Sequence, residues 1–472
     1  MARNRIVGSA NVSSGCRNSS SLQRSARTGI ISLTLLLAGV TLAQPDTAWT
    51  YRYHPVAAGD YQPLAAFVDE NGGIYVAGWA QPDNDHMNAF LLKISSLGVL
   101  SWAKTFDNMT AAGAAMDDSG NVYISGATSG STANGSICLL KCEPDGDTAW
   151  VRSYGEAGKD FWALGSIAID DSGSVYACGA ADSEVRILKY RNGLLAGVLS
   201  YTLSGYTLSS GEFHVLNNGD VYLVLNVEHP ARWEDWLTVR LSSGGQVLWE
   251  RHFKDTDSTW EQPVWSQLDR KGNTYVTGIV ASRASEAQTS VCTMKRDSLG
   301  DTLWTRTYNG PENLRDEPSC LMLDQGSVYV AGWSMYKAMG ENHAITLIKY
   351  DSLGNQLWVS RHGGGDTTDD PGYDNLYAEP QYRSICIDES GNVYIAGTES
   401  YDTIGPVKVL LKYDSLGSLV WVGKRFPSPD EGLHGAIAVL GRAGELYDIG
   451  TVAPFLDAGQ HRSILVTKYQ GR

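Results

Sequence analysis

Seven tryptophans of this 472-residue chain, Trp265 among them, stand in or beside stretches that follow no regular pattern. The other six are candidates for contact with a ligand: Trp79, Trp162, Trp233, Trp236, Trp260 and Trp333. Aromatic faces with carboxylates nearby suit stacking on sugar rings or holding a peptide. The alternative is that these rings pack inside the protein, beneath long loops or between its structural units.

Three histidines occur at nearly the same place before an apolar run, and they complete the set of ligand-binding candidates: His86, His343 and His461. Imidazole can ligate a metal or exchange a proton near neutral pH. Hydrogen bonding at the end of a loop is the favoured interpretation here, so the sequence predicts no metal site at these histidines.

Acidic residues also cluster in ways that could bind a cation or transfer protons. One cluster could hold Ca²⁺ through carboxylate oxygens: Asp366, Asp369, Asp370 and Asp374. Its spacing lacks the regular alternation of a calcium loop, which favours a solvated acidic loop, and we expect no cofactor. Neighbours such as Glu234 and Asp235, or Asp316 and Glu317, could support acid–base chemistry on a glycan, but the sequence contains no catalytic signature.

A tyrosine-centred repeat predicts the elements that position these residues. Eight tyrosines in apolar runs recur at intervals of 46 to 65 residues: Tyr75, Tyr123, Tyr176, Tyr222, Tyr275, Tyr329, Tyr394 and Tyr447. A period of this length is typical of propellers and solenoids, and it accommodates four short strands with their turns.

Each tyrosine is followed by a second apolar run that ends in a basic residue: Lys93, Lys141, Lys189, Arg240, Lys295, Lys349, Lys412 and Lys468. A last strand then carries tryptophan in most repeats: Trp102, Trp150, Trp249, Trp304, Trp358 and Trp421. The third repeat has Leu194-Leu195 there, so its outer strand is degenerate. The eight basic residues invite an anion-binding interpretation, but pairing with the aspartates of nearby turns is favoured.

The last repeat stops before its fourth strand, and the missing piece lies at the start of the chain. Residues 46–53 match residues 301–308 almost letter for letter, including Trp49 and Trp304. An N-terminal strand that completes the last repeat closes a ring and leaves no exposed strand edge. The sequence therefore predicts an all-β fold, an eight-bladed β-propeller of four-stranded antiparallel blades, as a single domain over residues 44–472.

The repeats resemble a known family through the segments DDSGNVYISG (117–126) and LLKYDSLGSLVW (410–421). They look like the bacterial secreted β-propeller repeats called SBBP-type, over essentially all of residues 46–472. This resemblance implies an architecture and no common reaction. The tryptophan-bearing strand also resembles, more distantly, the repeats of quinoprotein-type propellers, but the chain lacks the adjacent Cys-Cys pair of a quinone-dependent dehydrogenase.

The two ends of the predicted ring differ in regularity. With strands A to D counted outward, the A–B turns (Asp-x-x-Gly) and the C–D turns (Ser/Asp-Leu-Gly) share one end, which we expect to be inert. The B–C and D–A connections share the opposite end, and the irregular sequence falls there: 79–88, 227–236, 333–344 and 361–382. Long loops on a rigid scaffold commonly carry binding residues. We call this end the loop face.

The first 43 residues predict a secretory signal. Five arginines and no acidic residue precede an uncharged apolar run over 29–43, which is short for a membrane span. We expect cleavage near Ala43, an extracellular or periplasmic location and no membrane insertion. The formal charge of −15 disfavours nucleic acid as a partner.

Six cysteines follow the signal: Cys138, Cys142, Cys178, Cys292, Cys320 and Cys386. Four of them stand where other repeats have Ala, Val or Leu, which favours small buried side chains; one or two disulfides are the alternative. The favoured function is a secreted, non-enzymatic propeller that presents its loop face to a polysaccharide or protein. The alternative is a glycan lyase or hydrolase with a site over the central channel.

Overall fold

The computed structural model describes residues 46–54, 59–82, 86–128, 135–229, 234–253, 259–282, 285–337, 342–363, 384–401, 405–428, 431–442, 444–454 and 462–470. All regular structure within these ranges is β-strand, in eight four-stranded antiparallel sheets. The described residues include no helical segment with the length and apolarity needed to cross a bilayer. The predicted signal segment lies outside them.

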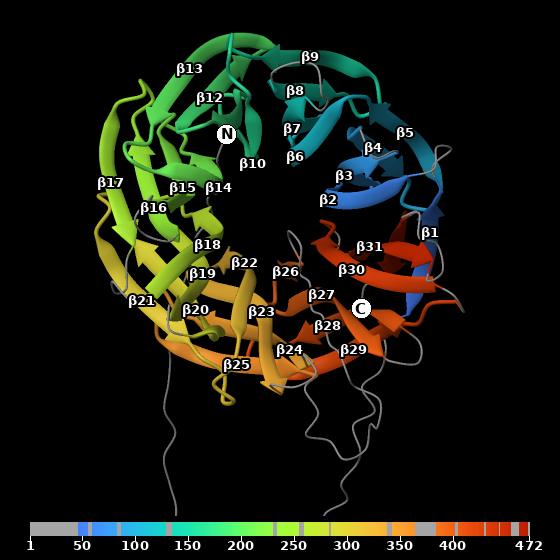
Figure 1. Ribbon diagram of the computed structural model, residues 1–472. Coiled ribbons are helices and arrows are strands. Elements are labelled where there is room, and N and C mark those ends of the chain that lie inside the picture. The colour runs from blue at the N-terminus through green and yellow to red at the C-terminus, as the bar shows by residue number, and fades with distance from the viewer. Residues whose placement is uncertain are drawn as a thin grey trace, which may run out of the picture. The chain divides into compact units, whose positions relative to one another are not determined.

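Each sheet is one blade, and in blades 1 to 7 the strands follow the chain outward from the axis (Figure 1). Blade 1 consists of β2 (Asp60–Val68), β3 (Ile74–Gln81), β4 (Asn88–Ile94) and β5 (Leu100–Phe106). Blade 2 consists of β6 (Met109–Met116), β7 (Val122–Thr128), β8 (Ile137–Cys142) and β9 (Thr148–Tyr154). Blade 3 consists of β10 (Trp162–Ile169), β11 (Val175–Ala181), β12 (Glu184–Arg191) and β13 (Leu194–Thr202). Blade 4 consists of β14 (Thr207–Val215), β15 (Val221–Glu228), β16 (Glu234–Leu241) and β17 (Val247–Phe253).

The second half of the ring repeats the same order. Blade 5 consists of β18 (Thr259–Leu268), β19 (Thr274–Ser282), β20 (Ser285–Arg296) and β21 (Thr302–Tyr308). Blade 6 consists of β22 (Asp316–Asp324), β23 (Ser327–Lys337), β24 (Asn342–Tyr350) and β25 (Gln356–His362). Blade 7 consists of β26 (Ile385–Ile387), β27 (Val393–Tyr401), β28 (Gly405–Tyr413) and β29 (Leu419–Arg425). Blade 8 consists of β30 (Glu431–Leu440), β31 (Leu446–Pro454), β32 (Ser463–Tyr469) and β1 (Thr47–Tyr53).

The first and last strands of the ring close it as the sequence predicts. Strand β1 pairs antiparallel with β32, and Trp49 stands opposite Lys468. The amide of Gln470 donates to the carbonyl of Asp46 at 2.8 Å. The eight-bladed, four-stranded propeller closed by an N-terminal strand is therefore confirmed.

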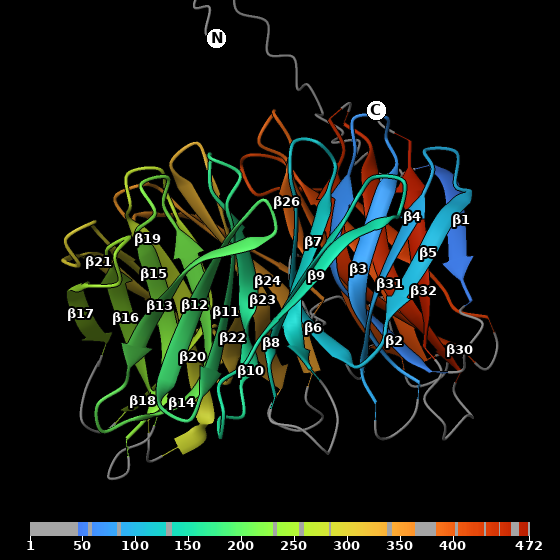
Figure 2. The ribbon, with the colours of Figure 1, turned by 90° about the horizontal axis from the view of Figure 1, so that it is seen from above.

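Tight hairpins form one end of the ring, which Figure 2 shows edge-on. In the turn after β2, the amides of Asn71 and Gly73 both donate to Oδ1 of Asp69, and Gly72 has a φ of 72°. Glycine adopts that left-handed conformation without steric strain. The Asp-x-x-Gly pattern is thus a turn requirement.

In most repeats the signature residues bind one blade to the next. In blade 5 the Lys295 ammonium lies 5.0 Å from the Tyr275 ring centre, and both Lys295 and the Trp304 indole N–H donate to the carbonyl of Ser352 in blade 6. The Trp304 ring lies against Gly354, where a Cβ would be 2.6 Å from it. We call this arrangement the blade latch.

The latch recurs around most of the ring. The indole N–H groups of Trp49, Trp102, Trp249 and Trp358 donate to the carbonyls of Ser96, Pro144, Ser298 and Ser415 in the next blade. All eight basic residues of the repeat lie over the tyrosine ring of their own blade. Some also pair with a turn carboxylate, as Lys93 does with Asp69 at 3.0 Å and Arg240 with Asp220 at 2.7 Å. The predicted pairing with turn aspartates is thus found for Lys93, Lys189 and Arg240, whereas the contact with a tyrosine ring is common to all eight.

Blade 3 lacks the latch to blade 4. The register position that Trp102 holds opposite Lys93 is taken by Gly197, opposite Lys189, and a Cβ on Gly197 would meet nothing within 4 Å. The outer strand β13 forms nonetheless, so the predicted degeneracy concerns the side chain and not the strand.

The cysteines contribute to the apolar packing between blades. All six cysteines beyond the predicted signal are buried and free, and each is at most 7% exposed, including the four that stand at Ala, Val or Leu positions of the repeat: Cys138, Cys178, Cys292 and Cys386. Burial raises the pKa of the Cys320 thiol to about 11. They pack as small hydrophobic side chains.

Candidate functional site

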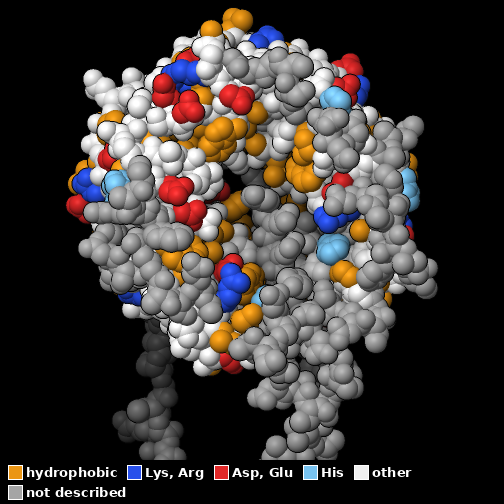
Figure 3. All heavy atoms as spheres, viewed as in Figure 1, with side chains coloured by type: hydrophobic (Ala, Val, Ile, Leu, Met, Phe, Trp, Pro, Cys, Tyr) orange, Lys and Arg blue, Asp and Glu red, His pale blue; other side chains and the backbone are white. Residues whose placement is uncertain are grey.

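The loop face is the end of the ring turned toward the viewer in Figures 1 and 3. Figure 3 shows a hollow at its centre bordered by hydrophobic side chains, with acidic side chains on the surrounding blades. The binding candidates from the sequence belong to this end.

The described tryptophan candidates lie in strands close to the loop face. Trp79, Trp162 and Trp333 are half-buried and pack against the apolar clusters between blades. Trp236 in β16 is fully buried against the Phe253 ring, 4.8 Å between centres, so a surface ligand does not reach it. Trp260 in β18 is half-buried. Trp233 lies outside the described residues.

The histidine and aspartate candidates also differ in exposure, and some of them lie outside the described residues. His86 is exposed. His343 is 7% exposed, and its ring centre lies 4.1 Å from that of Trp333, so these two candidates pack on one another. His461 and the acidic cluster of Asp366, Asp369, Asp370 and Asp374 lie outside the described residues. The described part of the chain has no group of three or more His, Cys, Asp or Glu side chains arranged to hold a metal ion.

An aromatic group lies on the loop face between blades 3 and 4. The ring of Tyr206, in the connection from β13 to β14, is 5.2 Å from the His229 ring and 5.1 Å from the His252 ring. The His252 ring is tilted by 31° to the tyrosine, while the His229 ring stands at 69° to it. We call these three residues the Tyr206 cluster.

Two carboxylates flank the Tyr206 cluster. Asp235 in β16 accepts a hydrogen bond from Nδ1 of His252 at 2.9 Å, and this bond raises the pKa of His252 above its usual value. Glu250 in β17 accepts a hydrogen bond from the hydroxyl of Tyr201 at 2.7 Å, and 42% of its side-chain surface is exposed. The site thus combines partly exposed rings with oxygen acceptors.

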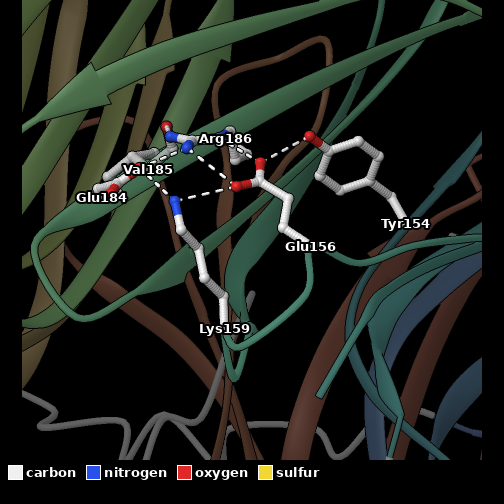
Figure 4. A network of polar contacts seen from close by, with 6 residues as sticks. All are labelled: Tyr154, Glu156, Lys159, Glu184, Val185 and Arg186. Carbon is white, nitrogen blue, oxygen red and sulfur yellow. Dashed lines mark hydrogen bonds and ion pairs between the residues drawn. The ribbon is translucent and has the colours of Figure 1, made fainter. Parts of the chain in front are cut away.

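A neighbouring ion-pair network joins the connection after β9 to the hairpin between β11 and β12 (Figure 4). Glu156 contacts Arg186, Lys159 and the Tyr154 hydroxyl at 2.7, 2.9 and 2.7 Å. Glu184 contacts Lys159 at 2.6 Å and also Arg186. Hydrogen bonds from Arg186 and Lys159 lower the pKa of Glu156 to about 2. A carboxylate held ionised in this way is a poor proton donor, so the network orients loops and does not supply a general acid.

The acidic pairs noted in the sequence do not form shared sites. Adjacent residues of a strand point to opposite faces of the sheet, which separates Asp316 from Glu317 in β22 and Glu234 from Asp235 in β16. Asp316 is 1% exposed and accepts a hydrogen bond from the Gly310 amide at 2.7 Å; burial raises its pKa. It is a structural residue of the loop before β22.

Sequence reasoning missed the Tyr206 cluster because its members are far apart in the chain: Tyr206 follows β13, His229 follows β15, and His252 lies in β17. One signal pointed to the region, namely the absence of tryptophan from the last strand of the third repeat. Tyr201 and Glu250 bond across this same blade 3–blade 4 interface, where the latch is missing.

Comparisons with known proteins support the fold. No protein-family model matches the chain, and no curated protein sequence matches it. Among similar solved structures, that of the Dos1 propeller has a TM-score of 0.51 at 10% identity, with 91% of this chain and 95% of that chain covered. The likeness is one of fold only.

Two further similar structures have lower scores. That of polysaccharide lyase Uly1 has a TM-score of 0.48 at 11% identity, with 89% of this chain and 92% of that chain covered. That of the WD40 domain of SCAP from fission yeast has a TM-score of 0.43 at 12% identity, with 88% and 97% covered. Membership of the SBBP-type repeat family stays a prediction from the sequence.

Proposed function

We propose that this protein is a secreted binding propeller that holds a neutral polysaccharide on its loop face, at the Tyr206 cluster. The observation that carries the proposal is a group of partly exposed rings beside two carboxylates, at a blade interface that lacks the latch. The repeats' resemblance to secreted bacterial propellers and the predicted signal over residues 1–43 support an extracellular or periplasmic location.

The chemistry of the site matches that of a sugar ring. The C–H face of a pyranose packs on aromatic rings, while its hydroxyls donate to carboxylate oxygens. Tyr206 and His252 offer ring surface, and Asp235 and Glu250 offer acceptors at its edge. The ion-pair network around Glu156 borders blade 3 on the same face and orders its loops.

The negative charge of the protein favours uncharged polysaccharides over anionic ones. A formal charge of −15 and carboxylates within the site repel uronic or sulfated chains. A neutral glucan, mannan or galactan is therefore the expected ligand, and an alginate is not.

The experiment is a calorimetric titration of residues 44–472 with neutral polysaccharides and with alginate. Replacing Tyr206 by Ala removes an aromatic contact of roughly 1.5–3 kcal/mol, which corresponds to about 10- to 100-fold weaker binding. Phe426→Ala is the matched control, because Phe426 is a 56% exposed aromatic residue beyond the end of β29, on another side of the ring. It should bind as the wild type does.

Two results would contradict the proposal. The proposed site is wrong if the protein binds no neutral polysaccharide, or if the wild type and Tyr206→Ala bind one with equal affinity. Release of new reducing ends from a bound glycan would instead favour the enzymatic alternative, so the same mixtures are assayed for them.

A further inference from the structure

The innermost strands of the eight blades border a cavity of 770 Å³ along the axis of the ring. Most of the residues that line it are apolar, and Phe67 and Trp265 are among them. A cavity of this size with an apolar wall and a few converging polar groups is typical of a site for a small molecule.

The polar groups of the wall gather between blades 4 and 5. Strand β14 contributes Glu212 and His214, and strand β18 contributes Ser266. Nε2 of His214 lies 2.7 Å from the hydroxyl oxygen of Ser266. Oε2 of Glu212 accepts hydrogen bonds from the Ser266 hydroxyl at 2.6 Å and from its amide at 2.7 Å. We call these three residues the channel cluster.

The channel cluster departs from the repeat. His214 stands opposite Tyr222, and the corresponding positions opposite the other repeat tyrosines hold Phe67, Ala115, Ala168, Met322, Cys386 and Val439, with Gln267 in blade 5. Six of these seven side chains are not hydrogen-bonding polar groups, so the fold has no general need of one there. The cluster is also no Ser-His-acid triad, because the carboxylate contacts the serine and not the imidazole, and Ser266 is 2% exposed.

The hydrogen bonds determine where the protons lie. Glu212 accepts twice through one oxygen, as a carboxylate does, and the single hydroxyl proton of Ser266 is directed to it. The bond between His214 and Ser266 then takes its proton from Nε2 of the imidazole. Burial lowers the pKa of His214 to about 4, so the neutral ring carries no proton on Nδ1. Nδ1 has no hydrogen-bond partner among the described residues.

Two kinds of acceptor consequently meet in one apolar cavity, a carboxylate and an imidazole nitrogen. The described residues that line the cavity include no Lys or Arg. A guest complementary to this wall carries several N–H donors and a positive charge at one end and an apolar body at the other.

We propose that the central channel binds a primary ammonium group on an apolar body, with the ammonium at Glu212 and His214. An ammonium has three donors, of which two meet the carboxylate and Nδ1. The body lies against the apolar side chains of the neighbouring blades. The ammonium belongs either to a free amine or to a lysine side chain of a partner.

The experiment compares hexylamine with hexanol and hexanoate, which share the chain length and differ in charge. We expect hexylamine to bind in a calorimetric titration and to raise the melting temperature, and the other two to bind about 10- to 100-fold more weakly. Acetyl-lysine methyl ester, with its free side-chain ammonium, forms a second arm. Binding of this compound as well assigns lysine as a source, and binding of hexylamine alone assigns a free amine.

The variant Glu212→Gln removes the charge but keeps an oxygen acceptor for Ser266, so we expect it to fold and to bind hexylamine about 10- to 100-fold more weakly. Glu70→Gln is the matched control, since Glu70 is an exposed carboxylate paired with Arg442 at the tight-turn end. If Glu212→Gln does not fold, His214→Phe is the second variant. Phenylalanine is the residue that blade 1 has at the corresponding position, Phe67, and we expect this variant also to bind hexylamine more weakly.

Three results would overturn the proposal: no binding of hexylamine, equal affinity for hexanol, or undiminished affinity in the folded variants of the channel cluster. The Tyr206→Ala variant should bind hexylamine like the wild type. This outcome separates the channel site from the polysaccharide site, and either proposal can fail without the other.

Discussion

The blade latch predicts that two glycines with the same backbone conformation respond differently to a methyl group. Gly354 has a φ of 79° and Gly326 a φ of 82°, and both lie in tight turns of blade 6. A Cβ on Gly354 would be 2.6 Å from Cδ2 of Trp304, whereas on Gly326 its nearest neighbour would be Ser352 Cβ at 3.9 Å. Gly326→Ala therefore reports backbone strain alone, and Gly354→Ala reports strain plus the latch.

The two glycine variants should differ in their loss of free energy of unfolding. Alanine in the left-handed region costs roughly 1–2 kcal/mol, which applies to both. Inserting a methyl group into the packed contact with Trp304 adds about 1–3 kcal/mol. Gly354→Ala should thus destabilise the protein more than Gly326→Ala by that second amount.

The assay is chemical denaturation of residues 44–472 and the variants, with slopes compared to ensure that the same unfolding is measured. Trp304→Ala alone should lower the free energy of unfolding by roughly 3–5 kcal/mol. In the double variant the alanine at 354 no longer meets the indole, so the loss should be smaller than the sum of the two single losses. Equal effects of the two glycine variants, or strict additivity in the double variant, would refute the latch.

Three further predictions concern closure, a buried ion pair and pH. Trp49→Ala removes the latch between β1 and blade 1 and should lower the free energy of unfolding by roughly 3–5 kcal/mol; an unchanged denaturation curve would contradict closure by β1. Lys408 and Asp448 are 3.0 Å apart and 1% exposed, so Lys408→Met should destabilise by roughly 3–5 kcal/mol, and adding Asp448→Asn should recover part of this. The hydrogen bond to Asp235 raises the pKa of His252 in the folded protein. Protonated His252 therefore stabilises the fold fully below a pH of about 6.5, the pKa of an unfolded histidine. This stabilisation is lost as the pH rises through the higher pKa of the folded state. The difference in melting temperature between wild type and His252→Gln should therefore shrink as the pH rises, and an NMR titration of His252 should give a pKa above about 6.5.

The ring could be predicted from the sequence because its signature residues act within one repeat or between successive repeats. Tyr275, Lys295 and Trp304 recur with a fixed order, and their contacts repeat around the axis. The carbonyl of Ser352 that joins them belongs to the next blade. A backbone acceptor leaves no mark on residue type, so the latch itself was not predictable.

The candidate site was harder to predict because residue type does not reveal which side of a strand a ring occupies. Trp236 stands close to a connection in the sequence, but β16 begins two residues earlier and turns the indole toward Gly278 of blade 5. Tyr206, His229 and His252 each look ordinary where they stand. Only the packing of blades 3 and 4 brings them together.

Comparing the eight blades with one another shows which residues depart from the repeat. The eight blades solve the same packing problem, so a residue that breaks the pattern is one that the fold does not require. Gly197 in place of the latch tryptophan, the Tyr206 cluster at the loop-face end of the same blade interface, and Glu212 and His214 in the channel wall all involve blades 3, 4 and 5. The interface of blades 3 and 4 lacks the latch, whereas that of blades 4 and 5 keeps it through Trp249 and Ser298. The two proposed sites therefore share polar groups that depart from the repeat, and not the loss of the latch. The third to fifth blades are therefore where variants should be concentrated.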